Sequence, residues 1–248
     1  MNQQQQSQLV STARVVAIPI AHNEERAIGN VLDGFKDVRG VDVAVVDDGS
    51  TDGTPAVVRQ RGVTLIQQAR RGGAGAAIRT AYAWAREHGY DICVIMSGND
   101  KDRAAEIRRL VDPIARGEAD LVQGSRYLTG GRHIHMPLYR RIASRFIHPW
   151  LFSLAARRRM TDTTNGYRAL RLSILDDTRI DLHQSWLDNY ELEPYLLLKA
   201  IRLGYVVREA PVTKVYPPRP HSYTKMKPFT GWWSILRPVL ILGLGLKK

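Results

Sequence analysis

The chain has 248 residues and carries 36 Lys and Arg against 24 Asp and Glu, a formal net charge of +12 at pH 7. This excess favours anionic partners such as nucleotides and phospholipid surfaces, and the sequence has no zinc-ligand spacing or RNA-binding signature, so nucleic acid is not expected. Cys93 is the only cysteine, which excludes a disulfide framework and fits a reducing cytoplasm.

The chain divides into a tail and one domain. Residues 1–13 are rich in glutamine and lack the basic start and apolar segment of a signal peptide, so we expect a disordered tail. No repeat or clear linker interrupts residues 14–248. We therefore expect a single domain that ends in a basic, amphipathic segment from about residue 219.

Strands and helices alternate through the first half of the chain. Apolar, β-branched runs predict strands, and helical spacing of apolar residues predicts helices. The predicted strands cover residues 14–20, 43–46, 63–67, 91–96 and 120–123, and the predicted helices cover residues 24–35, 54–61, 76–88 and 104–115. This alternation predicts a three-layer α/β/α fold with a mostly parallel sheet, whose carboxyl edge is where ligands bind.

Polar side chains follow several of these strands. Asp47 and Asp48 end the second strand, and an unpaired buried carboxylate is costly, so we expect both at the edge of the sheet. The alternative is an ordinary strand–turn–helix junction with a polar cap. Residues 97–102 and 124–127 form similar polar clusters after later strands.

A glycine-rich turn with two arginines, residues 70–75, leads into the helix at residues 76–88. Backbone amides at a helix start, together with guanidinium groups, attract a diphosphate. Close packing of a small-residue helix against the sheet is the alternative.

The second half of the chain is basic and apolar. Residues 136–159 interleave apolar residues with arginines, which suits either an anionic membrane interface or a core helix with a solvated basic face. A polar turn is expected at residues 162–168, a helix at 191–203 and a strand at 205–215, at an edge because Pro211 interrupts it. The apolar run at 239–246 is shorter than the roughly 20 residues of a membrane span. It lies in an interface or packs back onto the domain.

Taken in order, the motifs resemble family 2 glycosyltransferases, and in pattern the dolichyl- and polyprenyl-phosphate sugar synthases. The motifs are Pro19 with Asn23-Glu24-Glu25, residues 45–54, residues 71–75, Gly124-Ser125-Arg126-Tyr127 and residues 162–168. The resemblance implies a GT-A fold with a Rossmann-like nucleotide-binding half, a nucleotide-sugar donor and inversion at the anomeric carbon.

The resemblance also implies roles for individual residues. Arg126 matches the arginine that binds the acceptor phosphate, and Arg140 and Ser144 match a second arginine and a serine one helical turn later. Asp162 joins these three as a catalytic candidate. The expected donor-binding residues are Pro19, Asn23, Glu24, Asp47, Asp48, Gly75, Ser97, Asn99, Lys101, Arg219 and Lys225.

Three functions remain open from the sequence. The first is transfer from a UDP-, GDP- or dTDP-sugar to polyprenyl phosphate by a cytoplasmic protein at the inner membrane face. A phosphate oxygen needs no strong general base. The second is transfer to a soluble hydroxyl or amine, which would need Asp162, Glu191 or Glu193 as base. The third is nucleotide-sugar binding without catalysis.

One departure from the family concerns the metal. The family's Asp-x-Asp is replaced here by Ser97-Gly98-Asn99, and the position of a metal-binding glutamine holds Lys101. Either Asp100 or Asp102 supplies the anionic ligand beside Asn99 for Mg²⁺ or Mn²⁺, or the ammonium group of Lys101 replaces the cation. Weak or altered metal dependence is the expectation.

Overall fold

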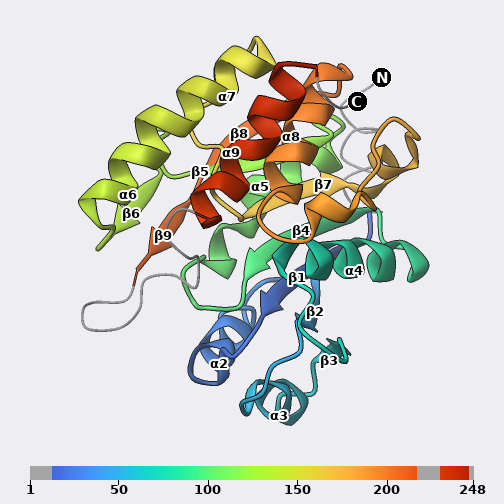
Figure 1. Ribbon diagram of the computed structural model, residues 1–248. Helices are drawn as coiled ribbons and strands as arrows, with labels where there is room; N and C mark the ends of the chain where they lie inside the picture. Colours follow the sequence, from blue (N-terminus) through green and yellow to red (C-terminus); the bar gives the residue numbers. More distant parts are fainter. Residues whose placement is uncertain (1–12, 217–229, 246–248) are drawn as a thin grey trace.

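The computed structural model describes residues 13–216 and 230–245, and its centre is a seven-stranded sheet (Figure 1). The strand order is β3-β2-β1-β4-β7-β5-β8, and β6 pairs with β9 in a second small sheet. The strands are β1 (Val15–Ala21), β2 (Asp42–Asp47), β3 (Thr64–Gln67), β4 (Ile92–Ser97), β5 (Leu121–Ser125), β6 (Arg132–Ile134), β7 (Arg168–Arg171), β8 (Val207–Pro211) and β9 (Thr213–Val215).

Helices cover both faces of the large sheet. They are α2 (Glu25–Asp33), α3 (Thr54–Gln60), α4 (Ala74–Glu87), α5 (Ile107–Ala115), α6 (Leu138–Ile142), α7 (His148–Ala156), α8 (Leu192–Arg202) and α9 (Thr230–Gly243), with a π-helical turn η2 (Ala143–Ile147) and 3₁₀ turns η1 (Ala104–Glu106), η3 (Leu172–Asp176) and η4 (Ser185–Leu187). One apolar core lies under α4, α7, α8 and α9, and the other lies under α2, α3 and α5. The three-layer prediction is confirmed.

Alternation along the strands explains the two cores. In β4, Cys93 and Ile95 belong to one core, and Ile92, Val94 and Met96 belong to the other. Successive side chains of a strand point to opposite faces, so a strand buried on both faces is apolar throughout. This is why β1, β2 and β4 could be recognised from their apolar runs.

The sheet is mostly parallel, as expected, but one strand was not predicted. β7 runs antiparallel between β4 and β5, with Val94 and Val122 both opposite Ala169. The strand has four residues and begins and ends in arginine, so it carries no apolar run. Its insertion places the polar turn at residues 162–168 beside the carboxyl end of β4.

The expected strand at residues 205–215 divides in two. β8 lies at the edge of the large sheet, as predicted from Pro211, and β9 leaves it to pair with β6. The apolar C-terminal run packs back onto the domain, because α9 contacts α7 and α8 and buries Val239 and Leu242. None of the helices in the described ranges combines the length and apolar character needed to cross a bilayer.

Candidate active site

A cavity of about 440 Å³ opens at the carboxyl edge of the sheet. Residues from both halves of the chain meet there, because β7 and β9 bring later segments beside the ends of β1 and β4. Its polar lining comprises His22, Glu24, Asp48, Arg71, Ser97, Asn99, Lys101, Arg140, Thr163, Thr164, Arg168, Tyr190, Glu193, Lys214 and Tyr216. Ile20, Ile78, Ile95 and Ile235 supply part of its apolar wall.

The two carboxylates at the end of β2 are buried and held by backbone amides. Asp48 accepts hydrogen bonds from the amides of Gly72, at 2.6 Å, and Gly73, at 3.1 Å. Asp47 accepts one from the amide of Ser50 at 3.3 Å. Such bonds compensate the cost of burial. Asp48 also lines the cavity, and its hydrogen bonds link the edge of β2 to the glycine-rich turn, whereas Asp47 is not among the cavity residues.

The loop after β1 is tied to the loop after β2. Asn23 has a φ of 52°, and its side-chain Oδ1 accepts a hydrogen bond from the backbone amide of Thr51 at 2.8 Å. The backbone amide of Asn23 donates to Ser50 Oγ at 2.8 Å. His22 Nδ1 lies 2.8 Å from the Asp48 carbonyl, which only accepts, so this nitrogen carries the proton.

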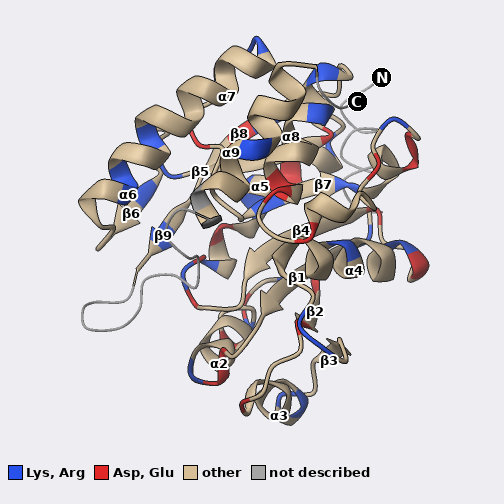
Figure 2. Cartoon of the chain, viewed as in Figure 1, with Lys and Arg blue, Asp and Glu red and all other residues tan. Residues whose placement is uncertain are grey.

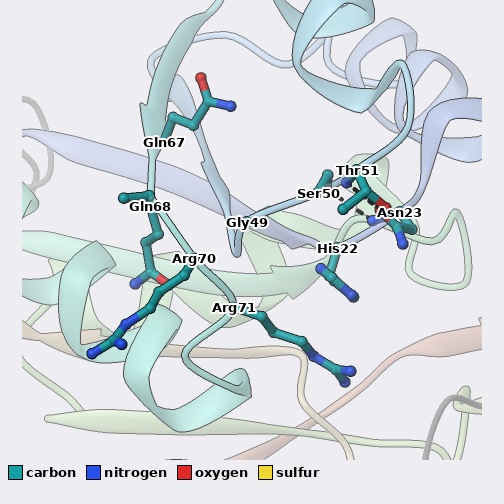
Figure 3. Close-up of a pocket in the computed structure, with 10 residues that line it drawn as sticks. His22, Asn23, Gly49, Ser50, Thr51, Gln67, Gln68, Arg70 and Arg71 are labelled. Atoms are coloured by element: carbon teal, nitrogen blue, oxygen red, sulfur yellow. Dashed lines mark hydrogen bonds between the residues drawn. The ribbon is translucent and has the colours of Figure 1, made fainter.

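A second hollow of about 780 Å³ is lined by residues of these two loops, the end of β3 and the glycine-rich turn (Figure 3). Its lining includes Gln67 and Gln68 from the end of β3, and His22 and Arg71 line both hollows. A ligand that occupied both would therefore pass between these two side chains.

The glycine-rich turn serves two purposes. Arg71 lines the cavity, whereas a Cβ on Gly75 would stand 1.9 Å from the Leu187 carbonyl oxygen. Close packing therefore explains Gly75, which is not among the cavity residues. The same approach lets the Ala76 amide donate to the Asp188 carbonyl at 3.1 Å, which fixes the start of α4.

Three cationic side chains from separate segments line the cavity, and two of them lie near the ring of Tyr216. Lys101 Nζ lies 5.7 Å and Arg140 Cζ 5.5 Å from the centre of its ring, and Lys214 from β9 lines the same cavity. Burial, together with the charges of Lys214 and Arg140, lowers the pKa of Lys101 to about 8. The site is therefore electropositive where the sequence predicts phosphate groups, with Lys101 expected on the donor side and Arg140 on the acceptor side.

The candidate metal ligands do not converge. Asp102 accepts from Lys214 Nζ at 2.7 Å and from the Ser97 amide at 3.0 Å, and Asp100 pairs with Arg103 at 3.0 Å. Asn99 Oδ1 is buried without a hydrogen-bond partner. In the part of the chain that the structure describes, no three His, Cys, Asp or Glu side chains are grouped so as to hold a metal ion.

The catalytic candidates occupy two places. Arg140 lines the cavity, whereas Arg126 and Asp162 form a buried ion pair behind it, with Arg126 Nε 2.6 Å from Asp162 Oδ2. Ser144 is also buried, and its hydroxyl donates to the Arg140 carbonyl at 2.7 Å and lies 2.5 Å from the Tyr127 hydroxyl.

The remaining predicted site residues lie in different parts of the chain. Pro19 lies within β1, opposite Met96 of β4, and Arg219 and Lys225 lie outside the described residues. Glu193 lines the cavity and pairs with Arg168 at 3.2 Å, while Glu191 is buried.

Sequence reasoning missed Arg168, Lys214 and Tyr216 as cavity residues. Each lies in or next to a short strand whose position depends on long-range pairing. For Lys214, the sequence did offer one signal. The expected strand at residues 205–215 contains both Pro211, which interrupts a strand, and this basic residue.

Comparison with known proteins agrees with this geometry. The sequence model of glycosyl transferase family 2 matches residues 16–179. An undecaprenyl-phosphate mannosyltransferase from Micrococcus luteus is 31% identical over 212 residues, which cover 82% of this chain and 84% of that protein. A polyprenol monophosphomannose synthase from Mycolicibacterium smegmatis is 33% identical over 180 residues, which cover 70% of this chain and 66% of that protein.

The fold has a counterpart among solved structures. Glucosyl-3-phosphoglycerate synthase from Mycobacterium tuberculosis, solved with Mn²⁺, UDP and glucosyl-3-phosphoglycerate, superposes with a TM-score of 0.72 at 19% identity, covering 100% of this chain and 86% of that one. This likeness establishes the GT-A fold. With the family match and the mannosyltransferase relatives, it shows that the chain is a glycosyltransferase that belongs to glycosyl transferase family 2.

Proposed function

We propose that this enzyme transfers a sugar, with inversion, from a nucleotide-sugar to a polyprenyl phosphate at a membrane surface. The observation that carries the proposal is the double role of α6. Arg140 of this helix lines the electropositive cavity, while its neighbours Leu138, Tyr139 and Ile142 are exposed to solvent. A lipid phosphate could therefore reach the cavity while its hydrocarbon chain stays at the surface that α6 presents.

The exposed apolar surface continues along η2 and α7. Phe146, Trp150 and Leu154 are 60%, 68% and 69% exposed and follow Ile142 at intervals of four residues, so they form one stripe. We call Leu138, Ile142, Phe146, Trp150 and Leu154 the apolar stripe. Isolated exposed apolar residues are ordinary, but a row of five marks an interaction site.

Basic residues accompany the apolar stripe. Arg141 and Arg145 are exposed beside it, and Arg157 to Arg159 follow the end of α7 (Figure 2). An apolar face flanked by arginines and an exposed tryptophan suits the interface of an anionic bilayer, where the rings enter the headgroup region and the guanidinium groups meet lipid phosphates. The proposed location is thus peripheral, on the cytoplasmic face of the membrane.

The carboxylates of the site favour a phosphate acceptor. Asp162 is engaged by Arg126 and Glu193 by Arg168, while Glu191 is buried and is not among the cavity residues, so none of the three is placed to remove a proton from a hydroxyl. A phosphate oxygen is already a nucleophile and requires no such base. The names of the relatives support the same acceptor class, because one is an undecaprenyl-phosphate mannosyltransferase and the other a polyprenol monophosphomannose synthase.

The donor side is proposed to lie along β1, β2 and β3. Asp48 and Glu24 line the cavity, and the second hollow beside Gln67 and Gln68 offers room for a base. Carboxylates and amides there can accept from ribose hydroxyls and from a base imide. A thermal-shift screen of UDP-, GDP- and dTDP-sugars would identify the donor, since a ligand that binds only the folded state raises its melting temperature.

Release of nucleoside diphosphate tests the proposal. The enzyme is given the donor found in that screen and vesicles with or without polyprenyl phosphate, and in parallel soluble sugar and amine acceptors. We expect release only with the lipid phosphate. Release that needs a soluble acceptor alone, or that fails with all acceptors, would overturn the lipid assignment.

A further inference from the structure

Three cations from distant parts of the chain share one wall of the cavity. Lys101 follows β4, Arg140 lies on α6 and Lys214 on β9, and the first two lie near the ring of Tyr216. Five cationic side chains line the cavity in the described residues, against the three carboxylates of Glu24, Asp48 and Glu193. The wall therefore attracts anions.

The two carboxylates predicted as metal ligands, Asp102 and Asp100, are already engaged. Both oxygens of Asp102 accept hydrogen bonds, one from Lys214 Nζ and one from the Ser97 amide, and its side chain is fully buried. Lys214 also donates to Asn165 Oδ1 at 3.0 Å, so it is held in place from two sides. Asp100 pairs with Arg103 and accepts from the Asn30 amide at 3.5 Å, and it is not among the cavity residues.

Of the predicted metal ligands only Asn99 remains, and within the described residues the cavity carboxylates of Glu24, Asp48 and Glu193 are not grouped so as to hold a metal ion. Asn99 Oδ1 is buried and without a hydrogen-bond partner, but it is a neutral amide oxygen. Mg²⁺ is usually bound through one or two carboxylates, and the charges of Lys101, Arg140 and Lys214 would repel it. The residues present thus disagree with the metal site that the fold family implies.

We propose that Lys101, supported by Arg140 and Lys214, takes the place of the divalent cation and holds the donor diphosphate directly. The inference rests on the proposed nucleotide-sugar donor. In the transfer, an oxygen of the acceptor phosphate forms a bond to the anomeric carbon while the bond from that carbon to the diphosphate oxygen breaks. Its electron pair stays on the diphosphate, and the three cations stabilise the added negative charge.

Metal-free nucleotide binding is the first test. Calorimetric titration of the wild-type enzyme uses UDP, GDP and dTDP, once with EDTA and once with added Mn²⁺. We expect the preferred nucleotide to bind with similar affinity under both conditions. Binding only with Mn²⁺ would overturn this inference and leave the proposed function intact, whereas no binding under either condition would overturn both.

Substitution of Lys101 is the second test. Lys101→Met should weaken binding of the nucleoside diphosphate in EDTA about ten- to a hundredfold, which is the contribution of a charge-assisted hydrogen bond. Binding of the corresponding nucleoside, which has no phosphate, should weaken much less. Lys101→Arg should retain most of the affinity. Lys36→Met removes a lysine whose side chain is 74% exposed, outside the cavity, and serves as the control for loss of charge.

The two outcomes of that series are distinct. If Lys101→Met melts at the wild-type temperature and binds the diphosphate as tightly as Lys36→Met, the inference is wrong. If Lys101→Met melts at a lower temperature than the wild type, metal-free diphosphate binding is compared between the wild type and Lys101→Arg instead. Undiminished metal-free binding by the arginine variant would support the cationic role, and loss of binding by that variant would count against it.

Discussion

Arg126 and Asp162 form a buried, two-pronged ion pair. Arg126 Nε and Nη2 lie 2.6 and 2.7 Å from the two carboxylate oxygens of Asp162, and both side chains are almost fully inaccessible. The same guanidinium donates to the Tyr216 hydroxyl at 2.8 Å, so the pair supports the ring against which Lys101 and Arg140 lie. The residue matched to the acceptor-phosphate arginine therefore already has an internal carboxylate partner.

This pair predicts a stability effect. Arg126→Ala leaves the buried Asp162 carboxyl group without its ion-pair partner, and breaking such a pair costs about 3–5 kcal/mol of unfolding free energy. Denaturant unfolding would measure the loss. The control is Arg116→Ala, which breaks an exposed pair with Glu118 and should cost less than about 1 kcal/mol. Equal stabilities for the two variants would show that the buried pair is not structural.

The apolar stripe predicts membrane binding. Replacing Phe146 and Trp150 by serine should weaken sedimentation with anionic vesicles about tenfold or more per ring, because each ring loses its transfer from water to the interface. Nucleotide binding should be unchanged. Val206→Ser removes another exposed apolar side chain, outside the apolar stripe, as the control. Sedimentation of the double variant at the wild-type level would contradict the proposed membrane contact.

Gly75 predicts a packing constraint. A methyl group there would meet the Leu187 carbonyl oxygen at 1.9 Å, so Gly75→Ala must displace either α4 or residues 187–189. Overpacking of this kind costs about 1–3 kcal/mol. Gly243→Ala is the matched control, since its added Cβ would find only ordinary contact, at 3.5 Å from Ala155 Cβ. Thermal unfolding of both variants would separate the two cases, and equal melting temperatures would refute the constraint.

His148 predicts a pH dependence of stability. Burial lowers the pKa of His148 from 6.5 to about 4. Its Nε2 donates to the Ile235 carbonyl at 3.2 Å, and Nδ1 accepts from the Thr163 hydroxyl at 2.6 Å, so the neutral ring is satisfied. Between pH 6.5 and pH 4 the histidine is protonated in the unfolded chain but neutral in the folded protein. The free energy of unfolding should therefore fall as pH decreases from 6.5 to 4, by about 3 kcal/mol in total.

Unfolding curves at several pH values would test this dependence. Carboxylates titrate in the same range, so His148→Gln is the reference: the difference in unfolding free energy between wild type and variant should shrink as pH falls. A constant difference across this range would mean that the histidine does not titrate as proposed.

Local sequence patterns predicted most of the elements in the first half of the chain. Strands buried on both faces must be apolar throughout, and helices between them must show one apolar face. For this reason the predicted bounds of β1 to β5 and α2 to α5 agree with the observed ones within two residues. The exception is the start of α5, where the first turn of the predicted helix is the 3₁₀ turn η1. The same local patterns located Asp48, Asn99 and Lys101 at strand ends, because the carboxyl ends of parallel strands share one edge.

The surroundings of these residues depend on contacts between segments that lie far apart in the chain. Short strands such as β7 and β9 owe their position to pairing partners far along the chain, and four or three residues carry too little pattern to reveal that pairing. Their placement brought Arg168, Lys214 and Tyr216 to the cavity and joined Lys214 to Asp102. Whether a carboxylate is available to a metal or neutralised by a lysine is set by such contacts, which local sequence does not encode.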